Sequence, residues 1–582
     1  MRKLHFRLIA FTLVIAMQTM ATATLHGHSE QGRDNSGRGS VRRYVRSKID
    51  SLLSDGLERR SRETRRVIVR VAPHAYRSLR KALKDDGYRV RKEHSLSSAL
   101  TADLPLDVVA DLSEHPSVLS ISTDAPVTGH QFSPLSSTTA SEVALRTSLG
   151  LSSFSPTGSG VGVAIIDSGI HPSSDFGSRI TAFYDFTRGG VASQPYDDYG
   201  HGTHVAALVA ANGGLSGGAY KGVAPSSRLI GLKVLDYEGK GLTSDVLAAL
   251  EFAIAQKNTL GIDVINLSLG HPVLEPAASD PLVQAVERAT AAGIVVVVSA
   301  GNMGINPATG EPGYQGILSP GNAPSAITVG SADTKGTKIR SDDAVGRYSS
   351  RGPTRFDTYI KPDIIAPGHK LAAVVPPTAT LALSFPTALV PTTAGANLHM
   401  RLTGTSMAAG VTSGVVAVLI NAHRSAFTTR PPLTPNAIKA ILQFTAVNVN
   451  DENGLPYHVL VQGAGALNGE GSLALTRLID TLAPRGATWL LNPIHPSSDY
   501  DEVLPWNQRV LWGKNIVWSD AMYSNQAAWG HNIVWGDNIV WSENIVWSEN
   551  IVWSENIVWS ESIVSANNII WGESLRILTD QE

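Results

Sequence analysis

Three short polar motifs in the middle of the chain supply an acid, an imidazole and a hydroxyl. Asp167 ends an apolar run, and His201 and Ser406 each begin an Ala- and Val-rich helical stretch. A serine hydroxyl is a weak nucleophile until a base takes its proton, and a carboxylate can orient that base. Asn302, which follows another apolar run, adds a side-chain amide donor. These four residues predict nucleophilic catalysis by a serine.

Each of these residues also has an ordinary structural interpretation. Ser at a helix start is usually an N-cap, and Asp or Asn after a strand usually serves a turn. Such roles explain the residues singly but not as a set within one domain. His204, three positions after His201, is better explained as a buried structural histidine than as a second base. A zinc site at this His pair is disfavoured, because no carboxylate motif accompanies it.

Apolar strands alternate with helices from about residue 158 to residue 480. The runs 161–166 and 293–298 are continuously apolar, as in strands covered on both faces, and helical stretches occupy 244–255 and 281–292. This alternation predicts an α/β fold with a parallel sheet and helices on both faces. In such folds the carboxyl ends of the strands carry the chemistry, which is where the polar motifs lie.

The order Asp, His, Ser, together with its flanking residues, resembles the subtilisin-like serine proteases (subtilases). The resemblance covers about residues 158–475 and depends on several motifs in order, each of them weak alone. The motifs are Asp167-Ser168-Gly169, His201-Gly202-Thr203-His204, Ser268-Leu269-Gly270, Ala300-Gly301-Asn302, Lys361-Pro362-Asp363-Ile364, Ala366-Pro367-Gly368 and Gly404-Thr405-Ser406-Met407-Ala408.

The resemblance implies a serine endopeptidase that acts on polypeptides through an acyl-enzyme. Ser406 would attack, His201 would be its base and Asp167 would orient that base. Asn302 and the backbone N–H of Ser406 would stabilise the oxyanion.

The resemblance also implies where a substrate binds. An extended peptide would add as a strand between two enzyme segments. The matching residues are Gly239, Lys240 and Gly241 on one side, Ser268, Leu269 and Gly270 on the other, and Ala300 and Gly301 at the floor of the primary specificity pocket. Small residues there predict a pocket that accepts large apolar side chains.

The chemistry of the family needs no cofactor, although structural calcium is common in subtilases. Asp175 lies near a family calcium ligand, but the Asn-rich loop that completes that site is not recognisable in residues 212–215. The metal ligands therefore stay unassigned.

The sequence departs from the family pattern at two places. Gly410 stands where a Pro usually follows the nucleophile, and it would leave space beside Ser406 for an amine acceptor. Peptide ligation is therefore an alternative function. The segment 371–401 is longer and more apolar than the family pattern, and the sequence assigns it no role.

The ends of the chain predict a secreted precursor, destined for the extracellular space, the cell surface or the periplasm of a bacterium. A basic start, an apolar run of about ten residues and Ala21-Thr22-Ala23 indicate a signal peptide, since a membrane span needs about 20 residues. Strand and helix patterns after residue 64 suggest a small α+β module that resembles the subtilase propeptide, an inhibitor and chaperone. The predicted regions are signal 1–25, basic flexible leader 26–63, propeptide 64–124, linker 125–155, catalytic domain 156–480 and tail 481–582.

Composition separates the tail from the rest of the chain. All 11 tryptophans, Trp489 to Trp571, lie in the last 94 of 582 residues, and this part has 3 basic and 12 acidic residues. The first 488 residues have 45 basic and 38 acidic residues. The aromatic segment is acidic, which argues against nucleic-acid binding. The chain has no cysteine, which excludes disulfides and a cysteine nucleophile.

The tail repeats the hexapeptide Asn-Ile-Val-Trp-Ser-Glu between Asn532 and Trp559. An even period keeps one side-chain row on one face of a strand, so the repeat predicts short strands coiled as a small β-solenoid or roll. The tryptophans would pack within it, or contact a cell surface or a polysaccharide. An adhesive surface protein, with the protease domain serving only maturation, is thus a second alternative function.

Overall fold

The computed structural model describes residues 48–61, 63–129, 144–390, 399–494, 504–517, 522–530, 539–542 and 551–554. The predicted signal peptide at 1–25 lies outside these residues. The chain divides into two units, Met1–Ile533 and Val534–Glu582, and each is described by itself.

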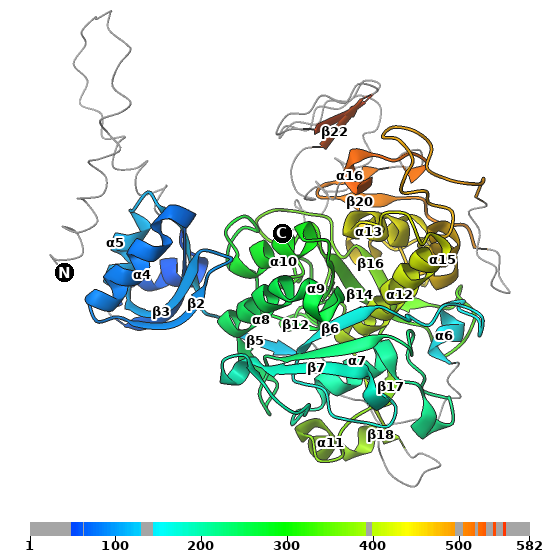
Figure 1. The fold of residues 1–582 in the computed structure, drawn as a ribbon, viewed down its shortest axis with the longest axis horizontal. Helices are drawn as coiled ribbons and strands as arrows, with labels where there is room; N and C mark the ends of the chain where they lie inside the picture. The colour runs from blue at the N-terminus through cyan, green and yellow to red at the C-terminus, as the bar shows by residue number, and fades with distance from the viewer. Residues whose placement is uncertain are drawn as a thin grey trace, which may run out of the picture. The chain divides into compact units, whose positions relative to one another are not determined.

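The first unit is built around a sheet to which the described residues contribute nine strands, in the order β15-β14-β13-β11-β6-β9-β7-β8, with β16 also paired to β14 (Figure 1). Neighbours pair in parallel except at β7–β8 and β14–β15. The predicted parallel α/β sheet is confirmed. The strands are β6 (Gly162–Asp167), β7 (Ile180–Asp185), β8 (Val191–Ala192), β9 (Arg228–Lys233), β11 (Ile262–Leu267), β13 (Val295–Ser299), β14 (Ile327–Asp333), β15 (Ala344–Val345) and β16 (Ile364–Pro367).

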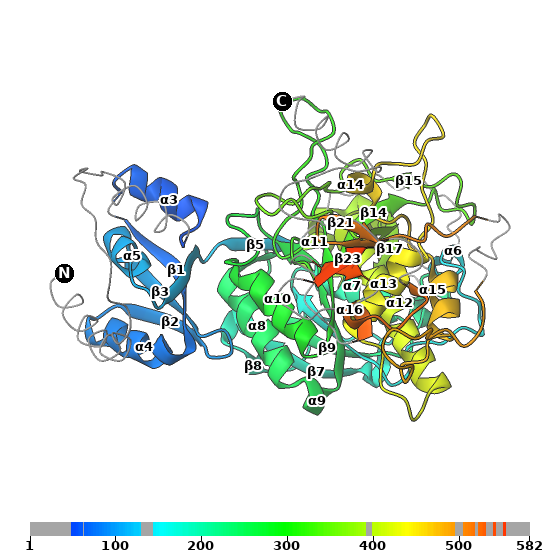
Figure 2. The ribbon, with the colours of Figure 1, turned by 90° about the horizontal axis from the view of Figure 1, so that it is seen from above.

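Helices cover both faces of this sheet (Figures 1 and 2). Helices α8 (Thr243–Ala255) and α10 (Pro281–Ala291) share one apolar core with alternate residues of β11, such as Ile265 and Leu267. Between these two, Asn266 points to the other face, where its Oδ1 accepts a hydrogen bond of 2.9 Å from Ser413 in α12 (Thr405–Ala426). Helix α7 (His201–Ala210) packs against α12 on that face.

Helix α12 is long and apolar enough to pass a length and composition test for a membrane span. Its most apolar window is nevertheless 94% buried within the fold. It is therefore a core helix that carries a polar first turn.

The N-terminal module, residues 48–124, is an α+β sandwich, as its sequence predicts. Its antiparallel sheet has the order β2-β3-β1-β4, and apolar side chains of the sheet and helices form a core separate from that of the central sheet. The elements are β1 (Thr64–Val71), α4 (Tyr76–Asp85), β2 (Arg89–His94), β3 (Ala99–Pro105), α5 (Leu106–Ser113) and β4 (Val118–Thr123).

The predicted flexible leader is wrong for its last part, because residues Ser51–Glu58 form helix α3. Asp50 caps this helix by accepting a 2.8 Å hydrogen bond from the N–H of Leu53. Leu53 is 1% exposed, and Gly56 lies under Leu106 of α5. The apolar pair Leu53 and Leu57, four residues apart, is the local signal for this helix.

The predicted linker 125–155 also contains ordered elements. Residues Pro126–Gly129 form strand β5, which lies between β10 (Lys240–Leu242) and β12 (Leu269–Gly270) in a three-stranded sheet. Residues Leu145–Ser148 form the short helix α6. The residues of β5 show no apolar pattern typical of a strand. The strand forms because β10 and β12 supply its hydrogen-bond partners.

Within the long segment singled out in the sequence, the described residues 371–390 and 399–402 form what we call the hairpin insertion. Strands β17 (Leu371–Val374) and β19 (His399–Leu402) pair antiparallel, and β18 (Leu389–Val390) pairs with β19. Helix α11 (Thr380–Ser384) lies between β17 and β18 along the chain.

The predicted tail boundary at residue 481 differs from the structure. Short elements β20 (Val510–Trp512) and α16 (Ala527–Gly530) pack against helix α13 (Pro435–Phe444) of the catalytic region. Trp506, Trp512 and Trp529 are buried there. The first part of the tail thus completes the core of the first unit.

The second unit contains two described strands, β22 (Ile539–Ser542) and β23 (Ile551–Ser554). They pair in parallel, with Trp541 opposite Trp553. Identical residues two hexapeptides apart therefore lie in register, as a coiled β array requires. The rest of the repeat lies outside the described residues.

Candidate functional site

Asp167 and His201 form a buried pair at the carboxyl edge of the sheet. Asp167 is the last residue of β6 and His201 the first of α7, and both side chains are 0% exposed. The Nδ1 of His201 lies 2.7 Å from Oδ1 of Asp167, which also accepts a 2.7 Å hydrogen bond from the N–H of Ser168. A carboxylate at Nδ1 fixes the proton there and leaves Nε2 as the basic nitrogen. That Nε2 is buried and has no hydrogen-bond partner among the described residues.

Asp197 caps the helix that carries His201, a role that the sequence analysis missed. Its Oδ1 accepts the N–H of Gly200 at 2.8 Å, and its Oδ2 accepts the N–H and hydroxyl of Thr203 at 2.8 and 2.6 Å. Gly200 has φ +101°, which a side chain would strain.

Ser406 lies in the first turn of α12 and is fully buried in this structure. Its hydroxyl donates a 3.0 Å hydrogen bond to the carbonyl oxygen of Ser268, and the Ser268 hydroxyl donates to the carbonyl of Ser406, also at 3.0 Å. Asn266 fixes the Ser268 hydroxyl with a 2.9 Å hydrogen bond. The nucleophile candidate is thus tied to the segment predicted to bind substrate.

Asn302 is oriented as an oxyanion donor requires. Its Oδ1 accepts 3.1 Å hydrogen bonds from both the N–H and the hydroxyl of Thr405, the residue before Ser406. Because a backbone N–H can only donate, these contacts fix the oxygen end of the amide. The Nδ2 end is buried and has no partner among the described residues, so it is available to an oxygen beside Ser406.

Strand β5 lies between the two segments predicted to bind an extended peptide and pairs with both. Lys240 is paired with Thr128 and Gly241 with Val127 on one side, while Leu269 is paired with Gly129 on the other. Gly239 and Ser268 precede these paired segments. A Cβ added to Gly129 would lie 3.3 Å from Nδ1 of His201, so β5 ends beside the catalytic candidate.

Ala300 and Gly301 are buried among neighbouring segments of the same chain. The N–H of Ala300 donates to Val329 at 2.9 Å, and Gly301 has φ +108°. A Cβ on Gly301 would meet Leu318 and Ser350 at 2.8 Å. This close packing explains the glycine, so Gly301 does not by itself widen a pocket.

Gly410 faces helix α7. A Cβ added there would lie 3.3 Å from both Cγ1 and the carbonyl oxygen of Val205. The predicted free space beside Ser406 is therefore absent at this position, because α7 fills it. The space expected at Gly410 was the reason for considering peptide ligation, so the structure removes the support for that alternative function.

His204 is a buried structural residue, as predicted. It is fully buried, and desolvation, followed by the nearby His201, lowers its pKa to about 3. Its Nε2 lies 3.1 Å from the carbonyl oxygen of Leu371 and 3.0 Å from that of Met400. Both neighbours are acceptors, so this nitrogen carries the proton.

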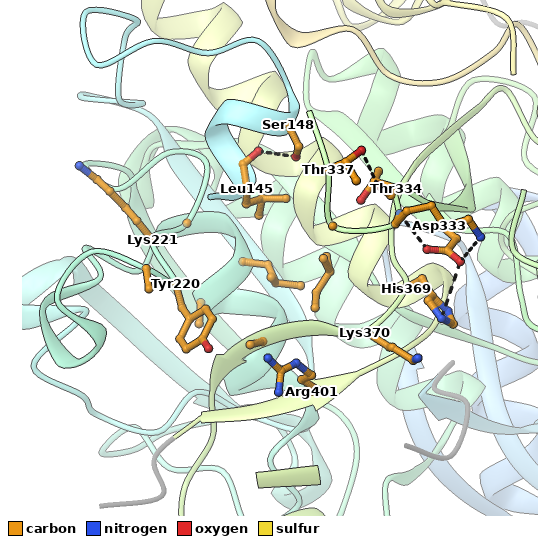
Figure 3. A pocket seen from close by; sticks show the side chains of 18 residues that line it. Leu145, Ser148, Tyr220, Lys221, Asp333, Thr334, Thr337, His369, Lys370 and Arg401 are labelled. Atoms are coloured by element: carbon orange, nitrogen blue, oxygen red, sulfur yellow. Dashed lines mark hydrogen bonds and ion pairs between the residues drawn. The ribbon is translucent and has the colours of Figure 1, made fainter. Parts of the chain in front are cut away.

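No group of three or more His, Asp or Glu side chains that could hold a metal occurs within the part of the chain that the structure describes. Oδ1 of Asp175, the residue near a family calcium ligand, accepts the N–H of Leu215 at 2.9 Å. A pocket of about 250 Å³ lies elsewhere, lined by residues such as Leu208 of α7, Lys221, Asp333 and Arg401 (Figure 3). It contains none of the four catalytic candidates, whose cleft is filled by β5.

A family model described as the subtilase family matches residues 158–465, which is more than half of the chain. The chain belongs to the subtilase family. It is a subtilisin-like serine protease, with the fold that its sequence predicted.

Two curated subtilases and one solved structure illustrate this relationship. Serine protease AprX of Bacillus subtilis (strain 168) is 38% identical over 322 residues, 54% of this chain and 67% of the relative. Subtilisin E of the same organism is 31% identical over 350 residues, 59% of this chain and 75% of the relative. The crystal structure of fervidolysin from Fervidobacterium pennivorans, a keratinolytic enzyme related to subtilisin, is similar in fold, with a TM-score of 0.53 and 21% identity over 71% of this chain and 61% of that chain.

Proposed function

We propose that this subtilase is a secreted endopeptidase that is made as a precursor and cleaves itself just after strand β5. The observation that carries this proposal is the position of β5, which is paired on both sides within the predicted substrate-binding segments and ends beside His201. The signal-like residues 1–25 support secretion.

The proposed chemistry uses Ser406 as nucleophile, His201 as general base and Asp167 as the group that orients the base. In this chemistry the Ser406 hydroxyl leaves the Ser268 carbonyl and donates to Nε2 of His201, which has no other partner among the described residues. Proton transfer to Nε2 then accompanies attack on the scissile carbonyl. Nδ2 of Asn302 donates to the oxygen that becomes negative, an interaction whose loss lowers kcat by about 10²–10³ in enzymes of this type.

The cleaved bond should lie within residues 129–131. Residues 126–129 are paired with β10 or β12 and would hold the acyl side of the peptide, and a Cβ added to Gly129 would lie 3.3 Å from the His201 ring. We therefore infer that cleavage takes place directly after this strand. In this interpretation the N-terminal module is a propeptide that stays bound through β5 until it dissociates.

Mass spectrometry of the purified product tests the proposal. The wild-type chain should yield a mature form that begins at residue 130 or 131, whereas Ser406→Ala should keep the N-terminal module covalently attached. Ser425→Ala is the matched control, because it makes the same change at an exposed position in the last turn of α12 and should process normally. A mature form of normal size from Ser406→Ala would contradict self-processing.

A further inference from the structure

The hairpin insertion contacts the His201 segment at two points that are independent of each other. One contact is made from inside the fold by His204, three residues after His201. The other is made by α11 on the loop just before His201. Together they bracket residues 198–204.

The inner contact joins the helix of His201 to the base of the insertion. Nε2 of His204 donates to the carbonyl of Leu371 in β17 and to that of Met400 in β19, at 3.1 and 3.0 Å. These two strands are paired with each other, with Ala373 opposite Met400. Because burial lowers the pKa of His204 to about 3, the ring stays neutral at ordinary pH. The contact therefore does not change with pH near neutrality.

The outer contact uses the first N–H groups of α11. The N–H of Thr380 donates to the carbonyl of Asp198 at 3.0 Å, and that of Leu381 to the carbonyl of Tyr199 at 3.1 Å. N–H groups in the first turn of a helix have no partner within the helix, so the loop before His201 completes α11. Gly200 lies under the same segment, because a Cβ there would meet Ala379 at 2.9 Å.

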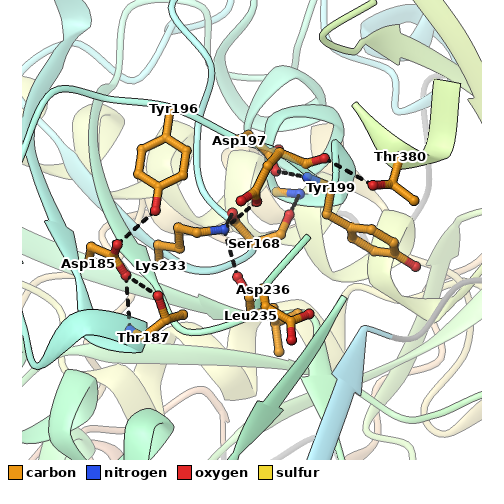
Figure 4. Close-up of polar contacts among 12 residues, drawn as sticks. Ser168, Asp185, Thr187, Tyr196, Asp197, Tyr199, Lys233, Leu235, Asp236 and Thr380 are labelled. Atoms are coloured by element: carbon orange, nitrogen blue, oxygen red, sulfur yellow. Dashed lines mark hydrogen bonds and ion pairs between the residues drawn. The ribbon is translucent and has the colours of Figure 1, made fainter. Parts of the chain in front are cut away.

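The contact continues from Asp198 to the end of β6. The Asp198 carboxylate binds Nζ of Lys233 at 2.6 Å, and Lys233 is 1% exposed. The same ammonium group donates to the carbonyls of Ser168 at 2.6 Å and Leu235 at 2.7 Å (Figure 4). Ser168 follows Asp167. The loop held by α11 is thus linked to the strand end that carries the acid.

We propose that the hairpin insertion positions His201, and that Thr380, Leu381 and His204 are positioning residues for the reaction. The inference rests on the proposed role of His201 as general base. Proton transfer needs Nε2 within hydrogen-bond reach of the serine hydroxyl, and an error of about 1 Å in such geometry can cost about 10²-fold in rate. The insertion would keep the imidazole in place while contributing no reacting group.

Thr380→Pro tests the outer contact with little change elsewhere. Position 380 is the first residue of α11, where Pro is tolerated, and Ala379 before it is already extended with ψ 149°. The proline removes both the N–H and the hydroxyl that donate to the Asp198 carbonyl, at 3.0 and 3.3 Å, whereas alanine removes only the hydroxyl. We expect kcat on a small peptide substrate to fall by about tenfold to 10²-fold with KM and Tm unchanged. Thr380→Ala, which keeps the N–H, should retain nearly full kcat.

A pair of variants tests the inner contact. His204→Leu removes the donor and should lower kcat, whereas His204→Gln places an N–H near the same position and should restore most of the loss. The carbonyls of Leu371 and Met400 are the groups that the glutamine must reach. If Thr380→Pro fails to fold, the two His204 variants still test whether the hairpin insertion positions His201.

The outcomes separate positioning from a merely structural role. If Thr380→Pro lowers Tm but leaves kcat per folded molecule unchanged, or if Thr380→Ala loses as much kcat as Thr380→Pro, the proposal is overturned. A His204→Gln variant no better than His204→Leu overturns the inner contact. Failure of the proposed function itself is distinguishable, because it would appear as full activity in Ser406→Ala.

Discussion

The N-terminal module and the hairpin insertion both border the cleft, but they are attached to the enzyme by different chemistry. The module contacts α8, α10 and the loop before α10 through charged and polar side chains, including the bonds of Asp124 to Ser244 at 2.8 and 2.9 Å and those of Ser97 to Glu251. The insertion uses backbone N–H groups and a neutral imidazole. This difference fits the proposed function, in which the module leaves and the insertion stays.

Burial has opposite consequences at the two contacts. Desolvation at the module interface raises the pKa of Asp124, Asp245 and Glu251, and it raises the pKa of Glu275 well above its usual range. Burial therefore makes each of these carboxyls easier to protonate while the module is bound. His204 at the insertion has its pKa lowered and holds no titrating charge near neutral pH. The module contact should respond to pH, and the insertion contact should not.

The largest expected effect is release of the module as pH rises. Glu275 is buried, and its pKa is raised first by desolvation and then by Asp280 and by Asp50 of the module, while Arg70 of the module also faces it. The complex holds a proton that the separated parts release. The contact is therefore strongest below the ordinary pKa of about 4.3 and weakens as pH rises through the raised pKa, by up to about tenfold in Kd per pH unit for each such group.

Size-exclusion chromatography of the self-cleaved complex at a series of pH values measures this release. Glu275→Gln keeps the shape of the side chain but cannot titrate, so its release should depend less steeply on pH. Glu311→Gln, at an exposed position of the catalytic domain, should behave as wild type. Release that is independent of pH in the wild type would remove the contrast between the two contacts.

A smaller effect is expected at the edge of the module interface. Lys92 of β2 is ion-paired with Asp245 in the first turn of α8, and the two side chains are 27% and 12% exposed. Because such a pair is partly screened by solvent, Lys92→Met should weaken the module contact by about 1 kcal/mol or less, about fivefold in Kd at most. Competition between the variant and wild-type modules, or release at high salt, measures it.

Lys84→Met is the matched control for this prediction. Lys84 pairs with Glu93 at 2.9 Å within the module, so its loss should not affect release. A weakening as large as that of Lys92→Met would mean that the change acts through the stability of the module, not through its contact with α8.

Strands and helices with their own apolar pattern could be predicted from the sequence, and elements made by their neighbours could not. The run 161–166 became β6 because continuous apolar residues suit a strand covered on both faces. Residues 126–129, Pro-Val-Thr-Gly, have no such pattern and form β5 only because β10 and β12 pair with them. Helix α3 was missed since its signal is a single cap and one apolar pair in a basic segment.

The candidate site divides in the same way. Asp167, His201 and Ser406 were predicted because reactive residue types follow strands or begin helices in a recognisable order. Asp197 and Lys233, which hold the His201 segment, were missed, because an isolated Asp or Lys carries no sign of burial or of its distant partners. The role of the hairpin insertion depends on the backbone of Thr380 and Leu381, whose N–H groups are common to all residues except proline.

The smallest expected effect is at Gly410, where the two helices that carry His201 and Ser406 touch. Alanine at this position gains up to about 1 kcal/mol in helix propensity. Its Cβ would press on Val205 at 3.3 Å, a contact tight enough to offset part of that gain. We expect Gly410→Ala to change the free energy of unfolding by less than about 1 kcal/mol.

The ratio of aminolysis to hydrolysis products made by Gly410→Ala tests the position of this residue more sharply than its stability does. Because Gly410 faces α7 and not the cleft, the ratio of aminolysis to hydrolysis with an added amine should be unchanged. A severalfold change in that ratio, seen as peptide products in mass spectrometry, would show that position 410 borders the acyl-enzyme after all. It would then follow that α7 and α12 move apart during turnover, and that the insertion side of the cleft is less permanent than its neutral, backbone-mediated contacts imply.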